Sequence, residues 1–300
     1  MAAAAQTREA TVVLVGDPWV IERAAKIVGV PTKRLTTYLP SARLAERDAP
    51  FGRPTAAAGR AQLRWIEQAT RLVVSGEAQA LVTGPVSKHA IAASGGRAKS
   101  FRGHTEHLAR RLGAREVVMA FWSERLVISL VTTHLPISLV PRALTPAKVA
   151  TAAFHTVQLM RRLGKRTPRV VVAALNPHAG EQGLLGREEI ERIGPGIASA
   201  RRRLSRGNVR SVLEGPVGAE TAIRKAAAGA YDAVVAMYHD QATIPMKLIG
   251  FGDAVNVTLG LPIVRTSVDH GTGYDIAGTG RADVRGMLEA IALAVKLAKR

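Results

Sequence analysis

The sequence predicts an α/β protein built on open, mostly parallel β-sheets. Short runs of β-branched residues alternate with segments of helical periodicity along nearly the whole chain, which is the pattern of repeated strand–helix units. The chain has 300 residues and 47% of them are hydrophobic, which is enough for one large domain or two medium-sized domains around a cleft.

The individual elements follow from local periodicity and turn residues. The predicted strands are 11–15, 80–83, 116–121, 126–132, 169–175, 209–213, 233–237, 254–259 and 263–267. The predicted helices are 20–28, 57–74, 146–163, 188–204, 219–227 and 283–299. The strands 116–121 and 126–132 are close enough in sequence to form a hairpin. Thr145 is the expected N-cap of the helix that follows it, and Pro195 is expected to break or kink its helix.

The composition excludes several classes of protein. The chain has no cysteine, so disulfides, thiolate metal sites and a cysteine nucleophile are excluded, and any metal must use His, Asp or Glu. No apolar run approaches the roughly 18 residues needed to cross a bilayer, so we expect no membrane partner. The N-terminal segment carries Arg8 and Glu9 and has no signal-peptide pattern, which favours a cytoplasmic location.

The net charge of +19 has more than one interpretation. Such an excess can mark nucleic-acid binding, but the Lys and Arg residues are mostly scattered and no basic run is interleaved with aromatic residues. We therefore expect a solvated basic surface and no nucleic-acid partner. A positive field would also steer an anionic substrate toward the protein.

Three of the eight histidines share one position relative to the predicted strands. His134, His178 and His239 each follow closely after the end of a strand. Ligands of open α/β sheets bind outside the carboxyl ends of the strands, so three imidazoles placed there could meet. They would suit zinc, cobalt, nickel or iron and would leave a position open for a substrate oxygen. The alternative is that each histidine only caps its strand; Asp240 could orient His239 or act as another ligand.

Two loops are dense in functional residue types. The segment 101–106, FRGHTE, places His104 and Thr105 at a predicted helix start, where free N–H groups favour an anion, although ordinary capping by Thr105 explains it equally well. The Gly-rich segment 269–278, DHGTGYDIAG, precedes a helix and could hold a nucleotide, but it is not the G-x-G-x-x-G fingerprint.

Three polar residues lie within one stretch of the chain beyond His239. They are Lys247, Asn256 and Arg265. Lys and Arg can clamp a phosphate or a carboxylate, although any one of them is more often a surface charge.

Taken together, these segments resemble the 4-hydroxythreonine-4-phosphate dehydrogenases, the PdxA family. The matching blocks, in family order, are LVTGPVSK at 81–88, GHTE at 103–106, TTHLP at 132–136, LNPHAGE at 175–181, MYHDQ at 237–241 and VNVTLGLPIVRTSVDHGTGYDIAG at 255–278. The resemblance implies a two-domain isopropylmalate dehydrogenase-like fold with mostly parallel sheets and a cleft between the domains. We expect the first domain to comprise 1–103 with 245–300, and the second, which carries the metal and the dimer contacts, to comprise 104–244.

The resemblance also implies an activity. Family members are homodimers with the active site at the subunit interface, and they use NAD and a divalent metal such as zinc, magnesium or cobalt. Their reaction oxidises a secondary alcohol beside a carboxylated carbon and then releases carbon dioxide, giving an amino-ketone phosphate for pyridoxal phosphate synthesis. The expected substrate of this chain is therefore 4-phosphooxy-L-threonine, a small phosphorylated hydroxy acid.

Matched residue by residue, the resemblance implies a role for each candidate. The metal ligands are His134, His178 and His239. The substrate-binding residues are His104, Thr105, Lys247, Asn256 and Arg265. The cofactor-binding residues are His270, Gly271, Thr272 and Asp275. Lys88 and Asp240 are the candidates for proton transfer.

The chain departs from the family pattern in three places. The family usually opens with a strand and G-D-P-A-G-I-G-P-E, whereas the segment from Gly16, GDPWVIERAAK, is similar to the family's second strand–helix unit. On that alignment the first strand–helix unit is absent, which we expect to weaken NAD binding. In addition, Glu220 replaces a usual Asp and Ala242 replaces a usual Gly. These departures leave open a paralogous dehydrogenase of erythronate or threonate 4-phosphate or of an aromatic cis-dihydrodiol, and a diverged homologue with weak or no activity.

Overall fold

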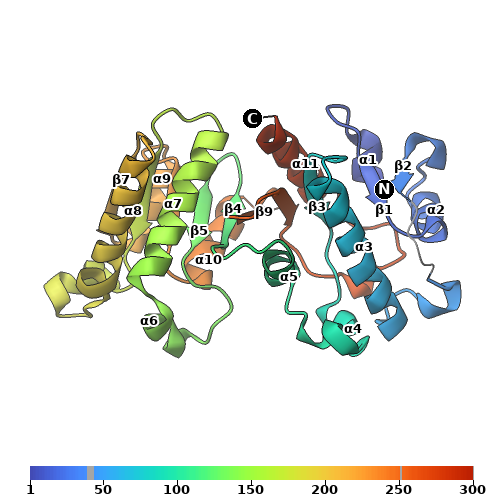
Figure 1. Ribbon diagram of the computed structural model, residues 1–300, viewed down its shortest axis with the longest axis horizontal. Helices are drawn as coiled ribbons and strands as arrows, with labels where there is room; N and C mark the ends of the chain where they lie inside the picture. Colours follow the sequence, from blue (N-terminus) through green and yellow to red (C-terminus); the bar gives the residue numbers. More distant parts are fainter. Residues whose placement is uncertain (39–43, 251, 300) are drawn as a thin grey trace. The chain divides into compact units, whose positions relative to one another are not determined.

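The computed structural model describes residues 1–38, 44–250 and 252–299, which form two compact units (Figure 1). Unit 1 comprises Met1–Ala114 and Leu261–Lys299, and unit 2 comprises Arg115–Gly260. Both boundaries therefore lie further along the chain than the expected 103/104 and 244/245. Residues 245–260 belong to unit 2 because the strand they contain pairs with a strand of that unit.

Unit 1 is built from two short parallel strand pairs and the helices that pack on them. Its elements are α1 (Ala2–Gln6), β1 (Val13–Val15), α2 (Pro18–Ile27), β2 (Thr36–Tyr38), α3 (Ala56–Val74), β3 (Ala80–Thr83), α4 (Lys88–Ala93), α5 (His104–Arg111), β10 (Val264–Val268) and α11 (Arg285–Ala298). Strand β1 pairs with β2, and β3 pairs with β10, in both cases in parallel. Helix α11 packs on β3 and β10.

The close packing of α3 on α4 fixes the start of α4 in unit 1. The Thr55 and Ser87 side chains cap the two helices by accepting hydrogen bonds from Ala58 N and Ala90 N. Gly59 allows the approach, because a Cβ there would lie 2.0 Å from the carbonyl oxygen of Ala90. The Gln62 side chain of α3 also accepts a hydrogen bond of 3.0 Å from Ser87 N, which connects the end of the loop after β3 to α3.

Unit 2 contains a larger sheet in the order β9-β4-β5-β8-β6-β7. Its elements are β4 (Val118–Trp122), β5 (Val127–Leu130), α6 (Val140–Ala143), α7 (Pro146–Arg162), β6 (Arg169–Ala173), α8 (Gly194–Arg206), β7 (Val212–Val217), α9 (Ala219–Ala227), β8 (Ala233–Ala236), α10 (His239–Ile249) and β9 (Val255–Leu259). Strand β4 is antiparallel to both of its neighbours, and the pairs formed by β5, β8, β6 and β7 are parallel.

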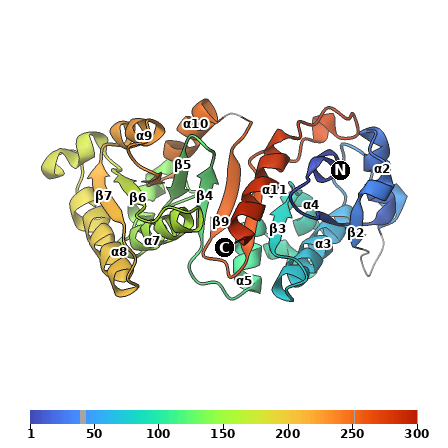
Figure 2. The ribbon, with the colours of Figure 1, turned by 90° about the horizontal axis from the view of Figure 1, so that it is seen from above.

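The sheet of unit 2 is buried on both faces. Helices α7 and α8 cover one face, and α9 and α10 cover the other (Figure 2). Val234 and Val235 are consecutive residues of the central strand β8, so their side chains point to opposite faces, and neither has any exposed surface. The carboxyl ends of the central strands are therefore held in place by the packed core.

The predicted mixed α/β fold with mostly parallel sheets is confirmed, and so is the hairpin, now formed by β4 and β5. Pro195 lies at the start of α8, directly after a π-helical turn at Glu189–Ile193, so the predicted helix changes type before Pro195 but is not interrupted there. Helix α10 and the exposed strand β2 were not predicted, and neither were the short helices α1, α4 and α6. No helix in the described part of the chain is long and apolar enough to cross a membrane.

Candidate functional site

Unit 2 presents the three candidate metal-binding histidines after neighbouring strands. His134 follows β5, His239 begins α10 after β8, and His178 lies in a turn after β6, while the strand order is β5-β8-β6. The rings of His134 and His239 lie 5.4 Å apart between centroids. Among the described residues, no three His, Asp or Glu side chains are grouped closely enough to hold a metal. One chain therefore pairs His134 with His239 but does not complete a three-ligand set with His178.

Asp240 orients the ring of His239. Its Oδ1 atom lies 2.7 Å from His239 Nδ1, which leaves Nε2 of the same ring as the nitrogen available to a ligand. A carboxylate on one ring nitrogen is the usual partner of a metal-binding histidine, because it fixes the tautomer and strengthens the other nitrogen as a donor. Lys247 is exposed on α10 and Asn256 is half-buried on β9, so both belong to unit 2 with the histidines.

A buried carboxylate shapes the turn that carries His178. Glu189 is 4% exposed, and its Oε1 accepts hydrogen bonds of 2.8 Å from the backbone N–H groups of Leu175 and Asn176. Its Oε2 accepts a third, 2.9 Å long, from the Asn176 amide. The turn runs through left-handed conformations, with φ of 51° at His178 and 81° at Gly180. A Cβ at Gly180 would lie 2.7 Å from Glu189 Oε2, so glycine permits this close approach.

In unit 1, His104 is held as a neutral ring at the start of α5. Burial lowers its pKa to about 3, and the positive charges of Arg265 and Lys88 and the His107 ring lower it in the same direction. Within the described part of the chain, His104 Nε2 is buried without a hydrogen-bond partner. A buried polar atom of this kind is costly unless a ligand or water satisfies it, so the ring is suited to a substrate hydrogen bond.

Arg265 supplies a buried positive charge close to His104. It lies on β10 with 4% of its surface exposed, and its Nη2 donates to Thr83 Oγ1 over 2.7 Å. Burial lowers its pKa to about 10, against the opposing effect of Glu106, so the guanidinium stays protonated at neutral pH. A guanidinium in such surroundings is suited to bind phosphate or carboxylate.

Lys88 and Thr105 lie in the same unit as Arg265. Lys88 is exposed at the first position of α4, and its Cε would stand 3.7 Å from a Cβ built at Gly103. Thr105 is half-buried in the first turn of α5. The five residues predicted as substrate-binding are thus divided, with His104, Thr105 and Arg265 in unit 1 and Lys247 and Asn256 in unit 2.

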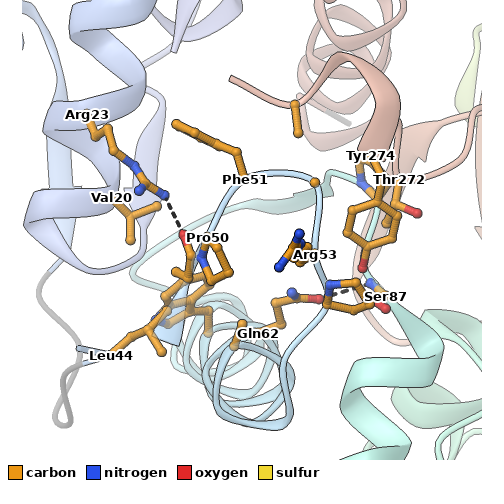
Figure 3. Close-up of a pocket in the computed structure, with 17 residues that line it drawn as sticks. Val20, Arg23, Leu44, Pro50, Phe51, Arg53, Gln62, Ser87, Thr272 and Tyr274 are labelled. Carbon is orange, nitrogen blue, oxygen red and sulfur yellow. Dashed lines mark hydrogen bonds between the residues drawn. The ribbon is translucent and has the colours of Figure 1, made fainter. Parts of the chain in front are cut away.

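A pocket of about 240 Å³ lies within unit 1 (Figure 3). Thr272 and Tyr274 line one part of it, and Phe51 lines another together with Arg23, whose guanidinium stands 4.0 Å from the Phe51 ring centre. Of the four predicted cofactor-binding residues, Thr272 lines this pocket; the other three, His270, Gly271 and Asp275, are exposed and are not part of its described lining.

Three residues of these sites were not singled out by the sequence. Glu189 follows another glutamate in a helical pattern, and nothing in that pattern distinguishes a buried carboxylate from a surface one. Gln241 and Tyr274 stand inside matching blocks, and that position is the signal that could have found them. Gln241 donates to the carbonyl oxygen of Ala174, and Tyr274 reaches the pocket of unit 1.

The chain is similar to known dehydrogenases over most of its length. A relative named 4-hydroxythreonine-4-phosphate dehydrogenase from Geobacter metallireducens is 47% identical over 256 residues, which is 85% of this chain and 73% of the relative. A D-threonate 4-phosphate dehydrogenase from Cupriavidus necator is 40% identical and covers 96% of this chain and 88% of its own length. The crystal structure of a 4-hydroxythreonine-4-phosphate dehydrogenase from Klebsiella pneumoniae matches with a TM-score of 0.86 and 34% identity, over 99% of this chain and 92% of that one.

The family model described as pyridoxal phosphate biosynthetic protein PdxA matches residues 8–294. Sequence and fold therefore agree over nearly the whole length, and the chain belongs to the PdxA family.

Proposed function

We propose that this chain is an NAD-dependent, divalent-metal-dependent dehydrogenase that oxidises and decarboxylates 4-phosphooxy-L-threonine in pyridoxal phosphate biosynthesis. The observation that carries the proposal is the pairing of the His134 and His239 imidazoles, in which Asp240 is hydrogen-bonded to Nδ1 of His239. The names of relatives at 47% and 44% identity support the same substrate.

The donor set fits a divalent metal. His134 and His239 offer imidazole nitrogens, and Asp240 gives His239 the second-shell carboxylate that such ligands commonly have. Zinc, cobalt or magnesium would lower the pKa of a substrate hydroxyl and stabilise negative charge on oxygen during oxidation and decarboxylation. The described residues of one chain do not group a third His, Asp or Glu side chain with this pair. His178, from the same copy or from a second copy, is the proposed third ligand.

The residues of unit 1 have complementary roles toward an anionic substrate. Arg265 carries a buried positive charge that would pair with the phosphate or the carboxylate. His104, neutral at physiological pH, would contribute a hydrogen bond rather than a charge. Lys88 is the proposed proton-transfer group of this unit, because it is a flexible amine beside the start of α5.

The pocket of unit 1 is the proposed NAD site. Thr272 and Tyr274 come from the Gly-rich loop, and the Phe51 ring with the Arg23 guanidinium against it offers an apolar and aromatic surface for a planar base. Bound in this pocket, NAD would supply the hydride acceptor.

A homodimer is the proposed form of the enzyme. Each histidine-bearing strand end of unit 2 is followed by exposed apolar side chains: Leu135, Ile137 and Leu139 after His134, Leu184, Leu185 and Ile190 after His178, and Ile244 and Leu248 after His239. Among the described residues, these are all the large exposed apolar side chains of unit 2 except Val212. Because these exposed apolar side chains follow the histidine-bearing strand ends, we propose a second copy of the chain as the partner that would cover them and could complete the ligand set.

D-threonate 4-phosphate is the second candidate substrate, because a relative named for it is 40% identical over nearly the whole chain. The two local departures from the family pattern do not favour it. Ala242 is fully buried in the core of unit 2, and Glu220 forms a surface ion pair with Arg224 over 2.7 Å. Neither side chain changes the charge presented beside the histidines.

A substrate panel tests the proposal. The purified chain is supplied with zinc, cobalt or magnesium, with NAD or NADP, and in turn with 4-phosphooxy-L-threonine, D-threonate 4-phosphate and erythronate 4-phosphate. Turnover is measured by NADH absorbance and by the carbon dioxide released. We expect the highest kcat/KM with 4-phosphooxy-L-threonine as substrate and NAD as cofactor. Highest kcat/KM for another phosphorylated acid would overturn the substrate, and metal uptake without turnover of any of them would identify an inactive homologue.

A further inference from the structure

Three hydrogen bonds connect the strand ends that carry the candidate histidines. Thr132 Oγ1 donates to Met237 O over 2.7 Å, Met237 N donates to Gln241 Oε1 over 2.6 Å, and Gln241 Nε2 donates to Ala174 O over 2.8 Å. Thr132 and Met237 each stand two residues before a histidine, and Ala174 stands four residues before one. The series therefore connects the segments that lead to His134, His239 and His178.

The pairing of the strands explains why a side chain is needed to connect the segment after β8 with the segment after β6. Strand β8 lies between β5 and β6. On the β5 side, the backbone ladder continues beyond the strand, since Thr132 N donates to Met237 O. On the β6 side, the paired register ends at Val172 and Val235, two residues before Met237. Beyond that point, the Gln241 side chain accepts from Met237 N after β8 and donates to Ala174 O after β6, so it replaces a backbone hydrogen bond between the two strands.

From this geometry we propose that Gln241 is a positioning residue for the metal site, acting by fixing the segment of His239 to the segment of His178. Among the described residues, the Gln241 amide bonds one backbone donor and one backbone acceptor, so we assign it no direct contact with metal or substrate. Its position in the first turn of α10, two residues after His239, places it at the joint between strand and helix. Metal sites depend on such supports, because ligands displaced by a fraction of an ångström lose affinity.

The inference rests on the proposed function, since it assumes that these histidines bind a metal. Thr132 has the matching role on the other side of β8, where its hydroxyl adds a side-chain bond to a backbone bond. Loss of the Thr132 bond is therefore expected to matter less than loss of Gln241, because the backbone bond remains on that side.

The test compares metal affinity in the intact protein, measured by competition of zinc or cobalt with a chromophoric chelator. Gln241→Met removes both amide bonds at similar length, Gln241→Glu keeps the acceptor and loses the donor, and Thr132→Val removes the hydroxyl. Gln158→Met is the matched control, because Gln158 is half-buried on α7 of the same unit. We expect a loss of metal affinity of about 10- to 100-fold for Gln241→Met, less for Thr132→Val and none for Gln158→Met.

The thermal midpoint of the metal-free protein and the cobalt absorption spectrum are recorded for the same variants. A changed cobalt spectrum with reduced affinity supports a positioning role. A lower thermal midpoint with metal affinity within twofold of wild type would show that Gln241 only stabilises the fold, and would overturn the inference. Gln241→Glu, which has the same shape but sets an oxygen against Ala174 O, gives the same comparison if Gln241→Met does not fold. Absence of zinc and cobalt uptake by the wild type would instead overturn the metal site of the proposed function, and this inference with it.

Discussion

The buried His104 ring makes the stability of this protein depend on pH in a specific way. Its pKa of about 3 in the folded protein lies below the ordinary value of 6.5, because burial and neighbouring positive charges disfavour the protonated ring. The neutral ring therefore contributes stability above about pH 6.5, and this contribution is lost as the pH falls toward 3. Between pH 8 and pH 5, the loss from this single group works out to about 2 kcal/mol.

The variant His104→Gln removes the titrating group while it keeps a side chain that can hydrogen-bond. The free energy of unfolding is measured by urea titration from pH 8 to pH 5 for the wild type, for His104→Gln and for the control His89→Gln, where the histidine is exposed on α4. We expect the wild type and the control to lose about 2 kcal/mol more than His104→Gln over this interval. Parallel loss in all three proteins would show that His104 is not held as a buried neutral ring.

Three further variants test the other sites. Asp240→Asn should weaken metal binding about tenfold, which is near the low end for such partners because the Asp240 side chain is 69% exposed. The control Asp253→Asn should leave metal affinity unchanged. Equal affinities of the two variants in chelator competition would contradict the assigned orientation of the His239 ring. Leu248→Asp should raise the dimer dissociation constant at least about tenfold in sedimentation experiments, and the exposed control Val74→Asp should leave it unchanged. Glu189→Gln keeps one oxygen for the two backbone N–H groups but puts an N–H₂ group against the Asn176 amide donor, so the free energy of unfolding in urea should fall by about 2 kcal/mol. No change would refute the assigned contacts.

Local pattern predicted most of the regular elements well. Strand Ala80–Thr83 and helix Ala219–Ala227 have the bounds that the sequence predicts, because a buried β-branched run and an amphipathic repeat are both visible locally. Helix α10 was missed because it begins with polar residues and contains Pro245. Strand β2 was missed because it is three residues long and exposed, so burial leaves no alternation in its sequence.

The sequence by itself determined the family, the α/β fold class and the position of three histidines after strand ends, because each of these is written in contiguous residues. Only the tertiary structure decided that His134 and His239 come together within one chain, that His104 is neutral and Arg265 charged, and that Gln241 connects two strand ends. These properties depend on burial and on bonds between residues far apart in sequence, such as Gln241 and Ala174. A pattern of neighbouring residues carries no information about such distances, whereas the order of the strands in the sheet sets them.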